Sequence, residues 1–224
     1  AKSIRFYDLV VTTKSYNCNN DELPSLGVKK ILFQNNGFLS LLHKPCYLCD
    51  ETNYSHDVVF IGSAELDRLK LMNAMALSGI VINIYGVGWE RKVFAQYMHQ
   101  NLIIHHQELR GDSYSNALSC SKISLCFLRK INRDLQTART VEIPACGGFM
   151  LAERTDEHQK MFLEGVEAEY FEGVDELIAK TKYFLENKNK NERIKIARNG
   201  RERCLKSDYS LENRAKEILN KITQ

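Results

Sequence analysis

Between Asp57 and Glu186, short apolar runs alternate with segments in which apolar residues recur at helical spacing. Runs such as Val58–Ile61 are almost continuously apolar, as expected of strands buried on both faces. Strands that alternate with helices form a parallel sheet covered by helices on both sides, so the sequence predicts an α/β fold of this kind. The predicted strands are 58–61, 80–85, 102–104, 123–128, 149–152 and 168–171, and the predicted helices are 66–76, 93–97, 114–118, 140–145, one opening at 155, 174–185, 191–204 and 211–222.

The first 56 residues follow a different pattern. A strand over 6–12, a short helical stretch before Gly27 and a strand over 30–34 make one βαβ unit, which is too small to fold alone. We therefore interpret residues 1–56 as the tail of a preceding α/β domain, or as a packed extension with a linker. Residues 57–206 are expected to form the main, Rossmann-like domain, and residues 207–224 a C-terminal helix. Because the chain starts at Ala1 rather than Met, we expect either a removed Met or a piece of a longer protein.

Composition and charge exclude several classes of protein. The 224 residues carry 31 Lys and Arg against 28 Asp and Glu, a net charge of +3, which excludes a disordered tail and does not favour nucleic-acid binding. No apolar run of about 18 residues and no secretory leader are visible. We therefore expect no transmembrane segment and a cytoplasmic location, with peripheral attachment to a membrane left open.

The seven cysteines are odd in number and irregularly spaced, and most stand beside apolar residues. Such cysteines usually behave as small buried hydrophobes in a reducing compartment. His43, Cys46 and Cys49 could supply three zinc ligands, but no second pair stands at zinc-ribbon spacing. A simple loop after Pro45 is the better interpretation, and no metal is expected.

Candidate ligand-binding residues follow the predicted strands, because ligands of open parallel sheets bind beyond the carboxyl ends of the strands. Glycines there let a ligand approach the backbone, arginines bind phosphate, and a helix start near Thr137 offers N–H groups. Asp134 and Glu142, eight residues apart, could accept hydrogen bonds from sugar hydroxyls. The pattern predicts a pocket for a nucleoside diphosphate that carries a polyhydroxylated group. Its candidate residues are Gly62, Ser63, Arg68, Gly86, Gly88, Trp89, Arg129, Asn132, Arg133, Asp134, Thr137, Ala138, Arg139 and Glu142.

Simpler roles stay open for several of these residues. Trp89 could fill the core instead of stacking on a base, and Glu142 could be a solvent-facing helix residue. The chain contains no Gly-x-Gly-x-x-Gly, no P-loop and no Gly-x-Ser-x-Gly elbow, so a dinucleotide dehydrogenase, a P-loop enzyme and an α/β hydrolase are all poorly supported.

The run RTVEIPACGGFML at 139–151 resembles the Glu-Ala-x-Ala-x-Gly-x-Pro-Val signature of GT-B glycosyltransferases. More closely, it is similar to the CgeB-like, spore-maturation branch, which shares the group 1 glycosyltransferase C-terminal domain. Other segments agree in order, namely DVVFIGS at 57–63, YGVGW at 85–89 and ALSCSKI at 117–123. The resemblance covers about residues 57–222 and implies the donor-binding, C-terminal half of a GT-B fold.

The resemblance also implies roles for single residues. The family glutamate that binds the donor ribose falls on Glu142, and the one that meets the donor sugar falls on Asp134, where Asp is a departure from the family. The phosphate-binding amides fall near Thr137 and Ala138, and the basic residue after the first strand falls on Arg68. Arg139 matches a basic position of the CgeB-like branch, and either a phosphate contact or a structural salt bridge would explain it.

The resemblance implies a transferase that takes a nucleotide-diphosphate sugar as substrate, needs no cofactor and retains the stereochemistry of the sugar. It also implies an acceptor-binding N-terminal domain in the same or another chain, and a part in bacterial cell-surface or protein glycosylation. Two alternatives stay open. One is a non-catalytic GT-B-like module that binds a nucleotide or a partner, and the other is an epimerase-like GT-B enzyme.

Overall fold

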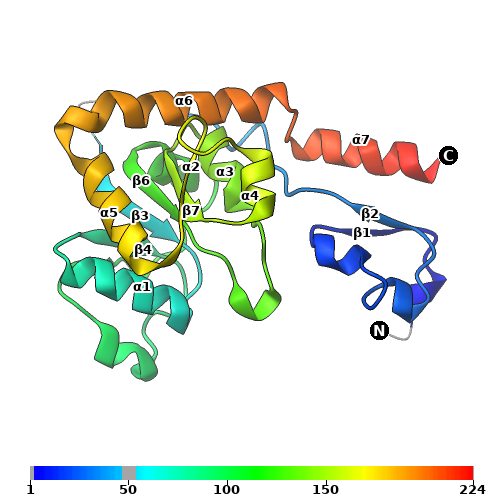
Figure 1. The fold of residues 1–224 in the computed structure, drawn as a ribbon, viewed down its shortest axis with the longest axis horizontal. Helices are drawn as coiled ribbons and strands as arrows, with labels where there is room; N and C mark the ends of the chain where they lie inside the picture. The colour runs from blue at the N-terminus through cyan, green and yellow to red at the C-terminus, as the bar shows by residue number, and fades with distance from the viewer. Residues whose placement is uncertain (1–2, 47–53, 224) are drawn as a thin grey trace.

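The computed structural model describes residues 3–46 and 54–223, and its main feature is a six-stranded parallel sheet. The strand order is β5-β4-β3-β6-β7-β8, so the chain winds outward from β3 in one direction and then from β6 in the other. This confirms the predicted parallel sheet with helices on both faces (Figure 1). The strands are β3 (His56–Ile61), β4 (Ile82–Tyr85), β5 (Leu102–Ile104), β6 (Ser121–Cys126), β7 (Met150–Glu153) and β8 (Glu169–Phe171).

Two apolar cores cover the two faces of this sheet. One contains Phe60 together with Leu69 and Phe184 from the helices on that side, and the other contains Val59 and Val141. Because neighbouring residues of a strand point to opposite faces, Val59 and Phe60 contribute to different cores. The helices are α1 (Leu66–Leu77), α2 (Gly111–Ser119), α3 (Arg139–Ala145), α4 (Asp156–Met161), α5 (Gly173–Leu185), α6 (Lys190–Lys206) and α7 (Leu211–Ile222).

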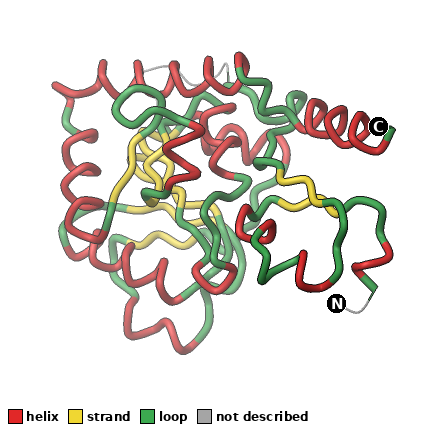
Figure 2. The backbone as a smooth tube through the Cα atoms, turned by 45° about the vertical axis from the view of Figure 1, so that its right-hand side comes forward, coloured by secondary structure: helices red, strands yellow, loops and turns green. Residues whose placement is uncertain are grey.

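A second, two-stranded parallel sheet joins β1 (Val10–Thr12) to β2 (Ile31–Phe33) and lies apart from the large sheet (Figure 2). The last helix, α7, extends back over this unit (Figure 1). The Gln34 side chain donates to the Arg214 carbonyl at 3.0 Å, and Phe38 forms a parallel bridge with Ser210. The segment that follows β2 is therefore packed against the start of α7.

The structure differs from the prediction at several elements. The strand predicted over 6–12 begins only at Val10, because the preceding residues form a 3-10 helix, η1 (Ile4–Phe6), and β2 offers three partners. The strand predicted over 123–128 runs from Ser121 to Cys126, since the Leu128 amide leaves the ladder and donates to Glu153 Oε1 at 2.7 Å. The helix predicted over 93–97 is the 3-10 helix η4 (Lys92–Tyr97). The other 3-10 turns are η2 (Ser15–Cys18), η3 (Pro24–Leu26), η5 (Lys130–Asn132) and η6 (Asn187–Asn189).

The cysteines follow the prediction in part. Cys126, Cys146 and Cys204 are buried, and burial raises the pKa of the Cys146 thiol to about 12. Cys120, in contrast, is disulfide-bonded and does not follow the expectation of buried cysteines in a reducing compartment. Cys49, the third residue of the considered zinc pattern, lies outside the described residues.

Among the described helices, none combines the length and the apolar character needed to cross a bilayer.

Candidate functional site

The site is organised by two turns that follow β3 and β4 at the carboxyl edge of the sheet. The Gly62 amide donates to the Tyr85 carbonyl at 2.9 Å, which holds the two turns together. Gly86 has φ +125°, and a Cβ atom there would lie 2.3 Å from the Gly62 carbonyl oxygen. Only glycine fits this close approach of two backbones. The two predicted glycines therefore leave a surface without side chains beyond the carboxyl ends of β3 and β4.

Trp89 packs in the apolar core beneath the Gly62 turn. It is 1% exposed, its ring stands edge-on to Phe60, and its indole N–H donates to the Gly62 carbonyl at 3.0 Å. A buried ring cannot stack on a nucleobase. The expectation that Trp89 contacts the donor nucleotide is therefore wrong, and its core alternative holds.

Three arginines converge on the turn between β3 and α1. Arg68 is 4% exposed and donates to the Ser63 carbonyl at 3.1 Å. Arg139, the first residue of α3, donates from Nε to the Ile61 carbonyl at 2.6 Å. The guanidinium carbons of Arg68 and Arg139 lie 5.8 and 5.9 Å from the centroid of the Phe60 ring. Arg129 approaches the same turn from the loop after β6.

The positive charge of this cluster is only partly compensated. Arg68 and Arg129 share one carboxylate, Glu65, and no ion pair of Arg139 is present among the described residues. Burial lowers the pKa of Arg68; Glu65 opposes this effect, while the charges of Arg139 and Arg129 add to it. Three guanidinium groups around one carboxylate leave a positive potential that favours a bound anion.

Glu142 is held by side chains that sequence analysis did not select. The Tyr114 hydroxyl donates to Glu142 Oε2 at 2.6 Å, and His43 Nε2 lies 3.7 Å from Oε1. Burial and the negative charge of Glu142 raise the pKa of Tyr114 well above its usual value, so the phenol stays protonated and remains a donor. The solvent-facing alternative for Glu142 is wrong, because its side chain is only 17% exposed.

A cavity of about 270 Å³ brings these features together. Gly62, Ser63, Gly86 and Arg139 line it, and Tyr114 links it to Glu142. A neighbouring hollow of about 410 Å³ contains Gly88 and Arg129 along with Ser63. The structure therefore brings several of the predicted phosphate-binding residues to one end of the sheet, whereas Arg68 lies in the lining of neither cavity.

Other candidates face the N-terminal unit instead. Asp134 is paired with Lys14, and its side chain is 7% exposed. The carbonyl of Asn132 accepts a hydrogen bond from the Tyr16 hydroxyl at 2.9 Å, and Arg133 pairs with Glu22 at 2.7 Å. These residues lie in the loop after β6 and outside the lining of the 270 Å³ cavity.

The start of α3 also differs from the prediction. The Thr137 amide donates to Thr140 Oγ1 at 3.0 Å, and this oxygen is bonded to His158 Nε2 at 2.9 Å. Thr137 therefore does not offer a free N–H to phosphate. Ala138 is exposed at the N-cap of α3 and lies outside the cavity lining.

Sequence reasoning missed Glu65, Tyr114, His43 and Lys14. Glu65 stands three residues before Arg68, so helical spacing could have revealed their pairing. For Tyr114, the sequence analysis predicts only a place in the helix over 114–118. His43 and Lys14 lie far from the site in sequence, and no spacing relates them to Glu142 or Asp134.

Known structures share this fold. Sucrose-phosphate synthase from Thermosynechococcus elongatus is 14% identical, with a TM-score of 0.69, and the match covers 99% of this chain and 59% of that one. A TarM mutant from S. aureus, in complex with fondaparinux, α-GlcNAc-glycerol and UDP, is 13% identical, with a TM-score of 0.72 and coverages of 98% and 44%. Anabaena HepE in complex with UDP and glucose is 14% identical, with a TM-score of 0.69 and coverages of 99% and 64%. The chain thus spans less than two thirds of the length of each of these structures.

These likenesses show the fold of the C-terminal, Rossmann-like domain of GT-B glycosyltransferases. Among curated proteins, no sequence matches the chain. The family described as "Glycosyl transferase-like" matches residues 68–220, which is more than half of the chain and includes Arg68, Arg139 and Glu142. The chain therefore belongs to the glycosyl transferase-like family.

Proposed function

We propose that this chain is the donor-binding part of a glycosyltransferase, which binds a nucleotide-diphosphate sugar and transfers the sugar to an acceptor with retention. The observation that carries the proposal is the arginine cluster, Arg68, Arg129 and Arg139, around a turn left bare by Gly62 and Gly86. A diphosphate would supply the negative charge that Glu65 alone does not provide. UDP in the structures of TarM and HepE supports this ligand class.

The proposed chemistry follows from where the charge develops. As the glycosidic bond of the donor breaks, negative charge builds on the leaving nucleoside diphosphate. Fixed guanidinium groups stabilise this charge without reorganisation, because the fold already holds them in place. Arg139 lines the cavity and is anchored by the Ile61 carbonyl, so it is suited to this role. Arg68 is buried outside both cavity linings, and it would add its positive charge while holding the Ser63 carbonyl in place. In this proposal the guanidinium groups neutralise the charge on the leaving diphosphate, which is the role of a metal ion in other transferases. We therefore propose a reaction without a metal cofactor.

Glu142 is proposed to bind a ribose hydroxyl of the nucleotide. Tyr114 and His43 fix its carboxylate beside the cavity, so little conformational freedom is lost when the donor binds. Binding energy from the nucleoside would then orient the reacting sugar. The Tyr114–Glu142 pair thus links nucleotide recognition to the position of the reacting centre.

One observation favours a second candidate, a non-catalytic nucleotide-binding module. Asp134 stands where the family resemblance places the residue that meets the donor sugar, but it is paired with Lys14 and almost fully buried. A carboxylate held in this way is not available to the sugar unless the N-terminal unit moves. In the non-catalytic module, nucleotide binding would persist without sugar transfer.

The setting of the reaction is also part of the proposal. Because the chain spans only 44–64% of the solved structures reported above, we propose that an acceptor-binding domain in the same or another chain completes the enzyme. The unit over residues 1–56 would join that domain to the donor domain over 57–206, with residues 207–224 packed against it. The CgeB-like resemblance supports a role in bacterial surface or protein glycosylation on the cytoplasmic side.

Calorimetric titration with UDP, GDP, TDP, CDP and ADP tests the proposal. We expect one nucleotide to bind, and Arg129→Gln to weaken it at least about tenfold, as for one lost charged hydrogen bond. Arg198→Gln, an exposed arginine of α6 that lines neither the 270 nor the 410 Å³ cavity, is the matched control and should bind normally. If neither this chain nor the longer protein binds any of the five, the proposed function is wrong.

Turnover separates the enzyme from the binding module. The sugar nucleotide of the preferred base is incubated with the longer protein and a candidate acceptor, and release of the nucleoside diphosphate is measured. Release that depends on Glu142 and Arg129 supports the transferase. Tight binding without release over many hours supports the non-catalytic module.

A further inference from the structure

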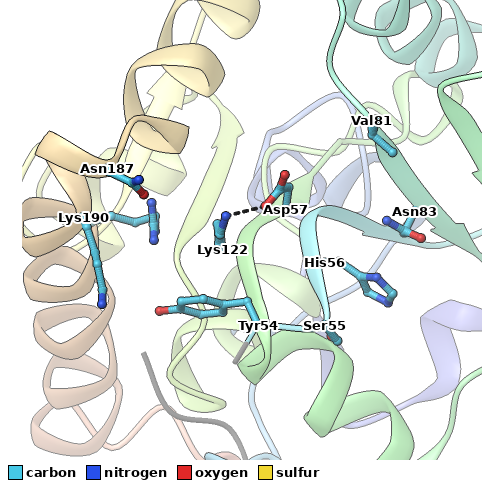
Figure 3. A pocket seen from close by; sticks show the side chains of 10 residues that line it. Tyr54, Ser55, His56, Asp57, Val81, Asn83, Lys122, Asn187 and Lys190 are labelled. Carbon is cyan, nitrogen blue, oxygen red and sulfur yellow. Dashed lines mark ion pairs between the residues drawn. The ribbon is translucent and has the colours of Figure 1, made fainter. Parts of the chain in front are cut away.

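A larger cavity, of about 460 Å³, lies at the opposite edge of the six-stranded sheet (Figure 3). Its wall includes Asp57 from the start of β3, Lys122 from the start of β6, and Lys190 and Arg193 from the first turn of α6. A strand rises about 3.3 Å per residue, so the six residues of β3 separate this cavity from the donor cavity by roughly 20 Å. It is therefore a separate site from the one at the carboxyl ends of the strands.

Arg193 is the unusual residue of this cavity. It is 3% exposed, its Nη1 donates to the Phe184 carbonyl, and its guanidinium carbon lies 5.6 Å from the centroid of the Tyr54 ring. No carboxylate among the described residues forms an ion pair with it. Buried charges in proteins are nearly always paired, because an unpaired one loses its hydration without compensation. An anion in the adjoining cavity would supply the missing counter-charge.

The rest of the wall suits an anion that is contacted from several sides. Lys122 Nζ lies 2.6 Å from Asp57 Oδ1, and Figure 3 shows this ion pair between the strands that carry the two residues, with Lys190 of α6 across the cavity. Asp57 is about half exposed, so Lys122 can exchange this solvated partner for a ligand at little cost. Tyr54 and Asn83 add a hydroxyl and an amide to the lining.

We propose that this cavity binds the phosphate group of a small phosphorylated metabolite. A carboxylate is satisfied by one guanidinium fork, whereas a tetrahedral phosphate can accept from Arg193 on one side and Lys122 on the other. The volume is within the usual range for small-molecule sites. Since the cavity is remote from the donor turns, the ligand is an effector and neither the donor nor the leaving nucleotide. The inference does not depend on the proposed transferase activity.

The probes are inorganic phosphate and glycerol phosphate, titrated into the full chain in chloride-free buffer. Binding is followed by calorimetry and mapped by amide chemical shifts. Lys122→Gln should weaken binding at least about tenfold, as one lost charged contact does. Arg193→Gln should abolish it, provided that circular dichroism shows a folded protein. Lys195→Gln, an exposed lysine on the same helix, is the matched control and should bind as the wild type does. Arg129→Gln removes phosphate bound at the donor turn and should leave the phosphate-induced amide shifts at the 460 Å³ cavity unchanged.

In the wild type, phosphate should change the amide chemical shifts of Ser55, Lys122 and the start of α6. The site is established if these changes are lost in Lys122→Gln. Absence of saturable binding by the wild-type chain overturns the inference. So does binding that Arg129→Gln removes and Lys122→Gln leaves unchanged, because the phosphate would then occupy the donor turn. Nucleotide binding is measured separately, so failure of either proposal can be told from failure of the other.

Discussion

The contact between the Gly62 and Gly86 turns can be tested by adding one methyl group. In Gly86→Ala, the new Cβ would lie 2.3 Å from a backbone oxygen, at a φ of +125° that side chains rarely adopt. Gly79 is the matched control, since its φ of +95° is similarly unfavourable but nothing lies within 4 Å of its added Cβ. The difference between the two variants therefore isolates the clash from the backbone strain.

The expected magnitudes follow from these two terms. Strain at positive φ costs about 1–3 kcal/mol, and both variants bear it. Both also gain the same small stabilisation from a stiffer unfolded chain, which cancels in the comparison. Overpacking against backbone adds about 1–3 kcal/mol to Gly86→Ala alone. We therefore expect Gly86→Ala to lower the free energy of unfolding by about 2 kcal/mol more than Gly79→Ala.

Urea unfolding followed by circular dichroism measures both free energies, and calorimetry measures nucleotide binding by each variant. Gly86→Ala should also weaken nucleotide binding, because relief of the clash displaces the Gly62 carbonyl and the turn that carries Ser63. Gly79→Ala should bind normally. Free energies within about 0.5 kcal/mol of each other, the usual spread for neutral substitutions, would refute the close approach of the two turns.

Three further predictions concern the site and the pH dependence of stability. Tyr114→Phe removes the donor to Glu142 and should weaken nucleotide binding roughly tenfold by calorimetry, whereas Tyr7→Phe at an exposed position should not. A hydrogen bond from Arg154 is the main reason that the pKa of Glu176 falls from 4.5 to about 2, so its stabilisation is complete above pH 4.5 and is lost as the pH falls toward 2. Urea midpoints over this range should fall less steeply in Glu176→Gln; equal slopes would contradict the pairing. Burial lowers the pKa of His158 below 6.5, so its contribution is complete above that pH and declines below it, and His158→Gln should show a flatter stability profile between about pH 7 and 5.

Much of the sheet could be predicted because its strands are buried on both faces. Residues 58–61 and 150–152 are buried apolar runs whose positions hardly depend on the rest of the fold. Strand ends are less predictable, because they depend on partners that are remote in sequence. Phe127 and Leu128 are as apolar as the strand before them, yet the chain leaves the sheet there when Glu153 captures the Leu128 amide.

Site residues could be predicted where the backbone of the sheet determines their position. They could not be predicted where pairing with residues remote in sequence determines their role. Gly62 and Gly86 follow strands, and a parallel sheet brings the ends of neighbouring strands together. Asp134 and Glu142 instead have residue types that suit several roles, and their partners decide between them. Lys14, which neutralises Asp134, is 120 residues away in sequence. No local pattern could have indicated that contact.

The loop between β6 and α3 carries residues of the arginine cluster and residues that pair with the N-terminal unit. Its contacts therefore bear on how the site could work. On one side Arg129 joins the arginine cluster, while on the other Asp134 and Gln136 bind Lys14 and Asn36 of the N-terminal unit. These contacts to the N-terminal unit are polar and charged. Polar interfaces between units exchange their partners for water at low cost, so relative motion is the default expectation for them. Opening this interface would free Asp134 from Lys14 while the core that holds Arg68 and Arg139 stays intact. In the proposed transferase, donor binding and the exposure of Asp134 would therefore be separable steps, so nucleotide affinity and sugar transfer are measured independently.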